Sequence, residues 1–292
     1  MKSMDRRAFI RQALAGTGVL ALPWSGFGES LLTAPGSRFA ADDRVALGRT
    51  GLVASRLALG SGTHGYAGSS DQTRMGLENF LKIIRRGYER GITFWDAADQ
   101  YGSHGSFREA LKYVPREKLV ILTKSSSRDA EGMRGDIERF RRELGVDTID
   151  ILLLHCMRDP GWTEKMKPAM DAISQAREKG VVRAFGISCH DLGALKAAAH
   201  SSWAEVILAR INHAGASMDA AVGEVVPVLR QAHENGKSIL GMKIVGVGEL
   251  RDQIDQSLKF VLGLGVVNAF TIGFESVQEL DQMIEKIAAV RV

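Results

Sequence analysis

Long apolar runs are missing from most of this sequence. Beyond the N-terminal region no segment has eighteen consecutive apolar residues, so we expect a soluble mature protein without a membrane span. A large excess of one charge sign is missing as well. The net charge is +4, and residues 1–41 already hold five basic against two acidic side chains, which leaves +1 for the rest. Nothing in this balance points to nucleic acid as a partner.

Two motifs that would direct the interpretation elsewhere are also absent. No G-x-G-x-x-G opens a helix after the first apolar run, which argues against a doubly wound dinucleotide-binding sheet. The histidines show no H-x-H or H-E-x-x-H spacing and carboxylates are sparse near them, so we predict no metal site.

The N-terminal region has the organisation of an export signal. MDRRAFIRQALAGTGVLALPWSG opens with basic residues, continues with a mild Ala/Gly/Leu run too short to span a membrane, and stops at Pro23. The pair Arg6-Arg7 followed by Ala-Phe-Ile is similar to a twin-arginine signal. Residues 1–41 are interpreted as signal and linker, read by the twin-arginine export machinery and giving a periplasmic protein. A basic amphipathic helix would have the same composition, and no clean A-x-A motif fixes a cleavage site.

Residues 42–292 alternate between apolar runs and segments with the spacing of amphipathic helices. The total of 292 residues, 45% of them hydrophobic, is usual for one α/β barrel. Strands are predicted at 56–62, 92–98, 118–124, 149–155, 181–188, 205–212, 237–244 and 268–273. Helices are predicted at 74–90, 135–144, 166–179, 192–199, 220–235, 250–262 and 276–289. Eight nearly continuous apolar strands, each followed by a helix or loop, predict a single (β/α)8 barrel.

A barrel fixes where function must lie, because active sites of this fold occupy the C-terminal ends of the strands. Asp96 ends the second predicted strand, Lys124 the third and His155 the fourth, and Tyr101 follows Asp96 closely. Four ionisable groups therefore converge on one rim. The alternative is an Asp96–Lys124 ion pair that only closes the barrel, beside a buried histidine and an ordinary rim tyrosine.

Four segments together resemble the aldo-keto reductase family. They are LGRTGLVASRLALGSGT, ITFWDAADQYG, LVILTK and IDILLLH, and the similarity runs from about residue 45 to residue 282. The resemblance implies a catalytic tetrad of Asp96, Tyr101, Lys124 and His155. It also implies hydride transfer between a nicotinamide cofactor and a small carbonyl or alcohol compound.

The chemistry needs these residue types. A carbonyl oxygen that gains negative charge needs a proton, and tyrosine holds its own tightly, with a reference pKa of about 10. Lys124 beside the phenol is expected to lower the pKa of Tyr101, and Asp96 to keep Lys124 charged. His155 is expected to donate or accept a hydrogen bond at the substrate oxygen.

The resemblance implies cofactor contacts with less complete matches. Ser188 in GIS is expected at the nicotinamide amide, and Asn212 is the nearest amide side chain on the sixth strand, although Arg210 could occupy that register. Met242 stands where the family places an aromatic ring. Lys243 and the amides around Gly246 and Gly248 could receive the pyrophosphate.

The segment IGFESVQELDQM departs from the family most. Glu275 and Glu279 stand where contacts to an adenosine 2′-phosphate are expected, and a carboxylate repels a phosphate but accepts a ribose hydroxyl. Both glutamates would also suit the first turn of a helix. Either interpretation favours NAD over NADP.

Other polar residues are expected at the same rim. His64, His155, His190 and His213 are expected there with Cys156 and Cys189, and two free thiols are favoured over a disulfide. The chain ends soon after its last helix, so an open pocket is expected, lined by His64, Tyr66 and Trp162 and suited to a polar or sugar-like substrate. The alternatives are a metal-dependent epimerase or lyase on the same barrel, and a binding protein of this fold without a cofactor.

Overall fold

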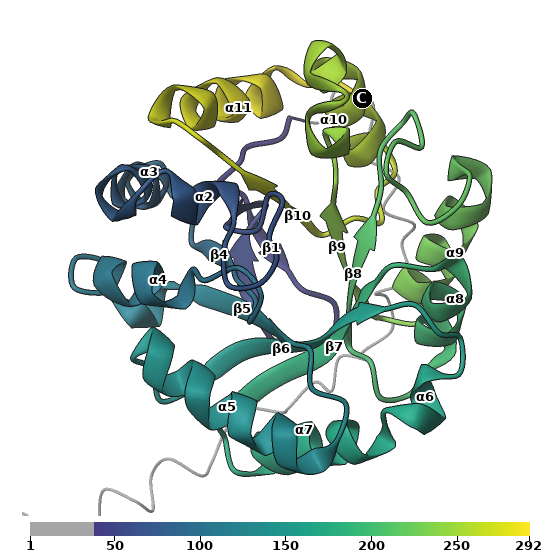
Figure 1. Cartoon of the computed structure of the whole chain (residues 1–292). Helices are drawn as coiled ribbons and strands as arrows, with labels where there is room; N and C mark the ends of the chain where they lie inside the picture. The colour runs from purple at the N-terminus through teal and green to yellow at the C-terminus, as the bar shows by residue number, and fades with distance from the viewer. Residues whose placement is uncertain (1–37) are drawn as a thin grey trace, which may run out of the picture. The chain divides into compact units, whose positions relative to one another are not determined.

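The computed structural model describes residues 38–292, and in that part of the chain eight parallel strands close into a barrel (Figure 1). Neighbours follow chain order from β3 to β10, and β10 pairs with β3 to close the ring. The strands are β3 (Leu57–Gly60), β4 (Phe94–Asp96), β5 (Val120–Ser125), β6 (Ile149–Met157), β7 (Val182–Cys189), β8 (Val206–Arg210), β9 (Ser238–Met242) and β10 (Ala269–Gly273). The predicted (β/α)8 barrel and all eight predicted strands are confirmed.

Helices surround the barrel on its outer side (Figure 1). The predicted helices correspond to α3 (Leu77–Glu89), α5 (Ala130–Leu144), α7 (Lys167–Glu178), α8 (Leu192–His200), α9 (Val222–Glu234), α10 (Ile254–Gly263) and α11 (Val277–Ala289). Three short helices were not predicted: α2 (Asp71–Arg74), α4 (His104–Ala110) and α6 (Trp162–Lys165). Helices of four to seven residues show too few turns for a periodic pattern.

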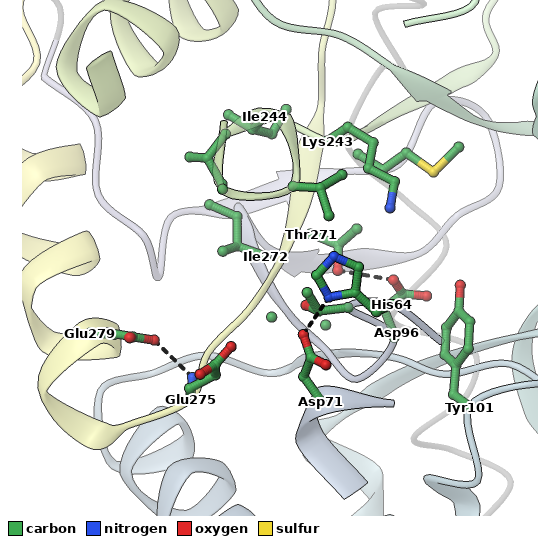
Figure 2. Close-up of a pocket in the computed structure, with 18 of the residues that line it drawn as sticks. His64, Asp71, Asp96, Tyr101, Lys243, Ile244, Thr271, Ile272, Glu275 and Glu279 are labelled. Atoms are coloured by element: carbon green, nitrogen blue, oxygen red, sulfur yellow. Dashed lines mark hydrogen bonds and ion pairs between the residues drawn. The ribbon is translucent and has the colours of Figure 1, made fainter. Parts of the chain in front are cut away.

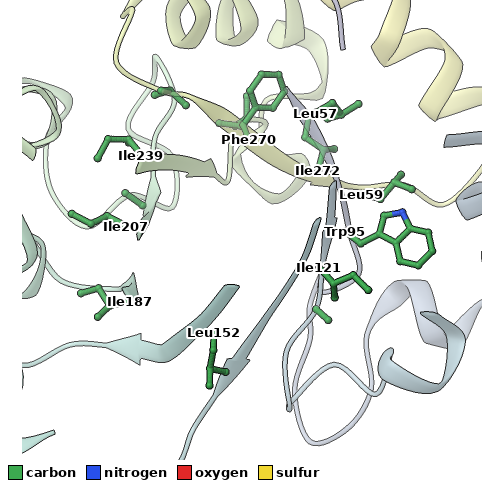
Figure 3. Packing of buried hydrophobic residues seen from close by; sticks show 14 of the residues in the cluster. Leu57, Leu59, Trp95, Ile121, Leu152, Ile187, Ile207, Ile239, Phe270 and Ile272 are labelled. Atoms are coloured by element: carbon green, nitrogen blue, oxygen red, sulfur yellow. The ribbon is translucent and has the colours of Figure 1, made fainter. Parts of the chain in front are cut away.

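The alternation of side chains along each strand divides the core into two layers. Outward-facing residues such as Trp95, Ile121 and Leu152 pack beneath the helices, where Figure 3 shows them around the barrel. Their inward-facing neighbours fill the barrel interior, among them Phe94 and Leu122. The same period of two brings the last inward residue of each strand to the open C-terminal rim.

The opposite end of the barrel is covered by an antiparallel hairpin of β1 (Arg44–Ala46) and β2 (Val53–Ser55), which was not predicted. Leu47 and Leu52 of this hairpin pack into the interior layer, so function is left to the C-terminal rim. Phe39 and Ala41 also belong to the core, and the packed body includes residues before the predicted boundary at 42.

The export-signal prediction concerns residues 1–41, of which 1–37 lie outside the described part of the chain. Within residues 38–292, no helix combines the length and apolar character that crossing a membrane requires.

Candidate active site

An ion pair anchors the rim at the ends of β4 and β5. The ammonium of Lys124 donates to Oδ1 of Asp96 and, at 2.7 Å, to the carbonyl of Ala97. Oδ2 of Asp96 accepts from the hydroxyl of Thr271 at 2.9 Å, a contact drawn in Figure 2. Both charged side chains are buried, and burial this complete requires partners on every side. The pair is therefore fixed in position.

The ring of Tyr101 lies between this pair and His155. The ammonium of Lys124 is 4.8 Å from the centre of the phenol ring, and the imidazole of His155 meets it edge-on at 5.7 Å. Two glycines make room for the ring: a Cβ at Gly62 would lie 2.2 Å from a Tyr101 ring carbon, and one at Gly65 would lie 2.4 Å away. The structure thus brings the four predicted tetrad residues together.

Burial adds to the expected electrostatics. The charge of Lys124 lowers the pKa of Tyr101, as expected, but burial raises it by more, so the pKa lies above its usual value. Burial would lower the pKa of Lys124, but Asp96 and Tyr101 raise it above its usual value. At neutral pH the site holds a protonated phenol beside an ammonium.

Asp99 is a site residue that the sequence did not single out. Its Oδ1 lies 3.0 Å from Nδ1 of His155, and its Oδ2 accepts from the N–H of Ser126 at 2.7 Å. Burial would raise the pKa of Asp99, but these hydrogen bonds lower it to about 2. Burial lowers the pKa of His155 despite Asp99. A neutral imidazole beside a carboxylate keeps its proton on Nδ1, which leaves Nε2 as an acceptor.

Two adjoining cavities open at this rim. The central cavity, of about 860 Å³, is lined by Tyr101 and His155 together with residues that follow most of the strands. The side cavity, of about 460 Å³, runs from Tyr101 past the ends of β9 and β10 to Glu275 and Glu279 (Figure 2). His64, Met242 and Lys243 line both cavities. One elongated ligand could therefore lie in the side cavity and reach the tetrad.

Backbone strain concentrates around the central cavity. Six non-glycine residues of the described chain have positive φ, and all but Ala67 line this cavity. They are His64, Cys156, Ser217, Lys243 and Val247. Such conformations cost free energy and persist at sites that need a particular side-chain direction.

Several other predicted residues also reach a cavity. Tyr66 is exposed and lines the central cavity, while Gly248, Glu275 and Glu279 line the side cavity. The N–H of Glu275 donates to Oε2 of Glu279 at 2.8 Å, so the two glutamates form one unit at the start of α11. Gly246 is buried and lines neither cavity.

Three further predicted site residues also line neither cavity. Trp162 is buried in α6 and donates to the carbonyl of Ala194, so its prediction as a pocket-lining residue is wrong. Asn212 is buried as well: its amide bonds the backbone of its own loop and of Lys243, because β8 ends at Arg210. It is Arg210, the alternative in that register, that lines the central cavity.

Ser188 also lines neither cavity, although it faces inward from β7. Its hydroxyl oxygen accepts from the N–H of Cys156 at 2.8 Å and joins the ends of β6 and β7. Three residues that line the cavities were not predicted: Thr271, Arg158 and Arg251. Thr271 could have been found from the inward register of β10, whereas Arg158 lies in a loop without periodicity and Arg251 begins a short 3-10 helix, Arg251–Gln253, inside the helix predicted at 250–262.

The other histidines and the two cysteines do not all lie at the central cavity. His190 and Cys156 line the central cavity, but His213 bonds Ser257 and Gln253 away from it and Cys189 is buried. Both cysteines are free. Among residues 38–292, no group of three or more His, Cys, Asp or Glu side chains is placed to hold a metal ion.

Comparison with known proteins agrees with this geometry. The model of the aldo/keto reductase family matches residues 58–291. The chain belongs to the aldo/keto reductase family. It is 24% identical over 201 residues to D-threo-aldose 1-dehydrogenase of a Pseudomonas species, covering 58% of this chain and 60% of that protein. It is 28% identical over 158 residues to an aldo-keto reductase of Glycine max, covering 49% of this chain and 44% of that protein.

Solved structures of the family share the fold. An aldo-keto reductase of Pseudomonas aeruginosa superposes with a TM-score of 0.73 at 21% identity, covering 87% of this chain and 98% of that one. The holo form of an aldo-keto reductase of Bacillus halodurans gives 0.70 at 18% identity, covering 85% and 92%. The chain spans only about half the length of the curated relatives it matches, so its own activity has to be argued from its site.

Proposed function

We propose that this family member is an oxidoreductase that transfers hydride between a nicotinamide cofactor and a small carbonyl or alcohol compound. The observation that carries the proposal is the protonated phenol of Tyr101, which faces the central cavity beside His155 and is backed by the buried Lys124–Asp96 pair. A proton donor of this kind is what a carbonyl oxygen requires when its carbon receives hydride.

An extended dinucleotide needs contacts to its pyrophosphate, to its ribose hydroxyls and to its nicotinamide amide, and the side cavity offers the first two. Lys243 and Arg251 provide cations for a pyrophosphate, and Gly248 has a left-handed backbone, with φ of 91°, that leaves the main chain open. Glu275 and Glu279 at its far end can accept ribose hydroxyls. The third part, the nicotinamide amide, lacks its expected partners Ser188 and Asn212, and Met242 provides an apolar contact there.

The bound cofactor would supply or accept the hydride, and the chain's own residues would manage the proton. In the reducing direction, Tyr101 gives its proton to the substrate oxygen as the carbon–hydride bond forms. The charge of Lys124 stabilises the phenolate left behind, and solvent returns the proton. In the oxidising direction the same phenolate takes the proton from the alcohol.

His155 gives a reason to favour a polyhydroxylated substrate. With its proton held on Nδ1 by Asp99, its Nε2 accepts a hydrogen bond and cannot donate one. A carbonyl oxygen offers no hydrogen to such an acceptor, whereas a second hydroxyl on the substrate does. We therefore propose a hydroxy-aldehyde, hydroxy-ketone or sugar-like compound.

Cofactor choice follows from the acidic end of the side cavity. Glu275 and Glu279 line it, and the pair would repel a 2′-phosphate. NAD is therefore the proposed cofactor over NADP.

We further propose that residues 1–41 direct export by the twin-arginine route to the periplasm. This rests on the order in which basic and apolar residues follow one another in the sequence.

The first experiment on the redox function is mass spectrometry of small molecules released from freshly purified protein, followed by turnover assays with both reduced cofactors and a panel of hydroxy-aldehydes. Released nicotinamide dinucleotide together with turnover supports the function. A protein that binds neither dinucleotide, with metal present instead, contradicts it.

A further inference from the structure

The two cavities differ in charge. Asp71, Asp96, Glu275 and Glu279 line the side cavity, where Lys243 and Arg251 are the cations. The central cavity is lined by Arg158, Arg210 and Lys243 and, within the part of the chain that the structure describes, by no aspartate or glutamate. A concave site that carries charge of one sign raises the local concentration of ligands of the opposite sign.

Arg210 ends β8 with its side chain directed inward and held on two sides. Its Nη2 donates to Nδ1 of His190 at 2.5 Å, and its Nη1 lies 3.2 Å from Oδ1 of Asp219. Burial and the charge of Arg210 lower the pKa of His190 to about 3, so this imidazole is neutral and its Nε2 carries the proton. His190 and Arg210 therefore present only donors to the cavity they line.

The other two cations have no partner to neutralise them. Among residues 38–292, no hydrogen bond or ion pair engages the side chain of Arg158 or of Lys243. Burial lowers the pKa of Lys243, and Arg210 lowers it further, as expected for cations gathered around one cavity. Asp219 is the carboxylate paired with this group, and it does not line the cavity.

The cofactor does not account for this charge. A dinucleotide in the side cavity would place its pyrophosphate near Lys243 and Arg251, which line that cavity. Arg158 and Arg210 line only the central cavity, on the side where Tyr101 and His155 face the substrate. Arg210 stands in the register of the nicotinamide amide contact, but an uncharged amide would not neutralise a guanidinium. The charge of both arginines, which matches a carboxylate or a phosphate, therefore remains for the substrate.

We propose that the substrate carries an anionic group, a carboxylate or a phosphate, which Arg158 and Arg210 bind while Tyr101 exchanges a proton with the reacting oxygen and His155 accepts from a neighbouring hydroxyl. This rests on the proposed oxidoreductase function and narrows it to hydroxylated oxo acids, sugar acids or sugar phosphates. The reaction that supplies such a substrate is an oxidation to an acid or a phosphorylation of a neutral sugar.

The test uses matched pairs that differ only in the anionic group: D-glucuronate against D-glucose, and glyceraldehyde 3-phosphate against glyceraldehyde. For the charged member of at least one pair we expect kcat/KM to be higher by about tenfold or more, and to fall as ionic strength rises. A higher kcat/KM for D-glucuronate than for D-glucose would identify the anion as a carboxylate, and a higher value for glyceraldehyde 3-phosphate than for glyceraldehyde would identify it as a phosphate. Equal values for both pairs would overturn the inference while leaving the oxidoreductase function in place.

Variants assign the effect to the two arginines. Arg158→Gln should lower kcat/KM for the charged member about tenfold and for the neutral member much less. Arg142→Gln, on the exposed face of α5, is the matched control and should leave the ratio unchanged. Arg210→Met is combined with Asp219→Asn so that no buried carboxylate is left unpaired. A ratio that stays constant in Arg158→Gln and in this double variant contradicts the inference.

Calorimetry covers the case in which no pair is turned over. D-Glucuronate and glyceraldehyde 3-phosphate are then titrated into the purified full chain, with D-glucose and glyceraldehyde as neutral references. Binding of an anion, but not of its neutral partner, would support the anionic substrate while contradicting the proposed activity. Binding of neither anion removes the inference.

Discussion

Nδ1 of His155 lies 3.0 Å from Oδ1 of Asp99, and this contact decides which nitrogen of the imidazole carries the proton. Asp99 is ionised, with a pKa of about 2, so it acts as the acceptor and Nε2 faces the substrate unprotonated. The orientation of an imidazole by a buried carboxylate is a general device for fixing a tautomer.

Asp99→Asn tests this relationship. Asparagine keeps the shape and, with its amide oxygen toward the Ser126 N–H, places its NH2 group against Nδ1 of His155. Nδ1 must then accept, so the imidazole proton moves to Nε2. We expect turnover to fall by about tenfold or more. Because Asp99 raises the pKa of His155, its loss should move the acidic limb of the pH–rate profile to lower pH. An unchanged profile and rate would show that Asp99 does not position the imidazole.

Tyr101→Phe tests proton delivery. The variant keeps the ring between Gly62 and Gly65 and removes only the hydroxyl, so the fold should be preserved. Turnover in both directions should fall by at least about a hundredfold. Circular dichroism and thermal unfolding provide the folding control. Parent-like activity in a folded variant would mean that another group supplies the proton.

Gly62→Ala tests the placement of the ring. The added methyl carbon would lie 2.2 to 2.6 Å from three ring carbons of Tyr101, so the phenol has to move. We expect a loss of turnover approaching that of Tyr101→Phe with little change in cofactor affinity. Gly135→Ala is the control, since a Cβ there meets nothing within 4 Å and alanine is the better helix former. Equal activity in both variants would mean that the ring is free to shift.

Period-two alternation accounts for how much of the site the sequence could predict. Asp96, Lys124 and His155 were found because a polar residue ends a buried strand, and the structure directs all three to the rim. Alternation does not separate Arg210 from Asn212, which have the same parity; the structure separates them because β8 ends at Arg210 and the chain then turns.

Loops carry the information that alternation does not. Asp99 and the positions of Gly62 and Gly65 depend on how loops from different strands meet at Tyr101, which no local pattern encodes. For Trp162, the residue type alone does not tell which environment the side chain occupies. Its large apolar ring suits a pocket wall or a helix interface equally, and the structure stacks α6 against α8 with Trp162 between them.

Cofactor choice is tested at the end of the side cavity. We expect the parent to bind NADH more tightly than NADPH, and Glu275→Ser combined with Glu279→Arg to narrow that ratio by about tenfold or to invert it. Glu279→Gln separates charge from structure, because its amide oxygen can still accept from the N–H of Glu275. Calorimetric titrations give the six affinities, those of the three proteins for NADH and for NADPH. Tighter binding of NADPH by the parent would contradict the proposal.

The export proposal and the redox proposal constrain each other. A twin-arginine signal delivers chains that are already folded, and no pool of free nicotinamide nucleotide is expected outside the cytoplasm. A protein with both properties must fold around its cofactor, carry it across the membrane and regenerate it by oxidising one substrate as it reduces another. Changing Arg6-Arg7 to Lys-Lys should therefore leave the protein in the cytoplasm, where fractionation and immunoblotting would find it with its nucleotide bound. Periplasmic parent protein, recovered free of cytoplasmic markers, should release dinucleotide on denaturation. If it contains none and binds none, export and hydride transfer cannot both be properties of this chain.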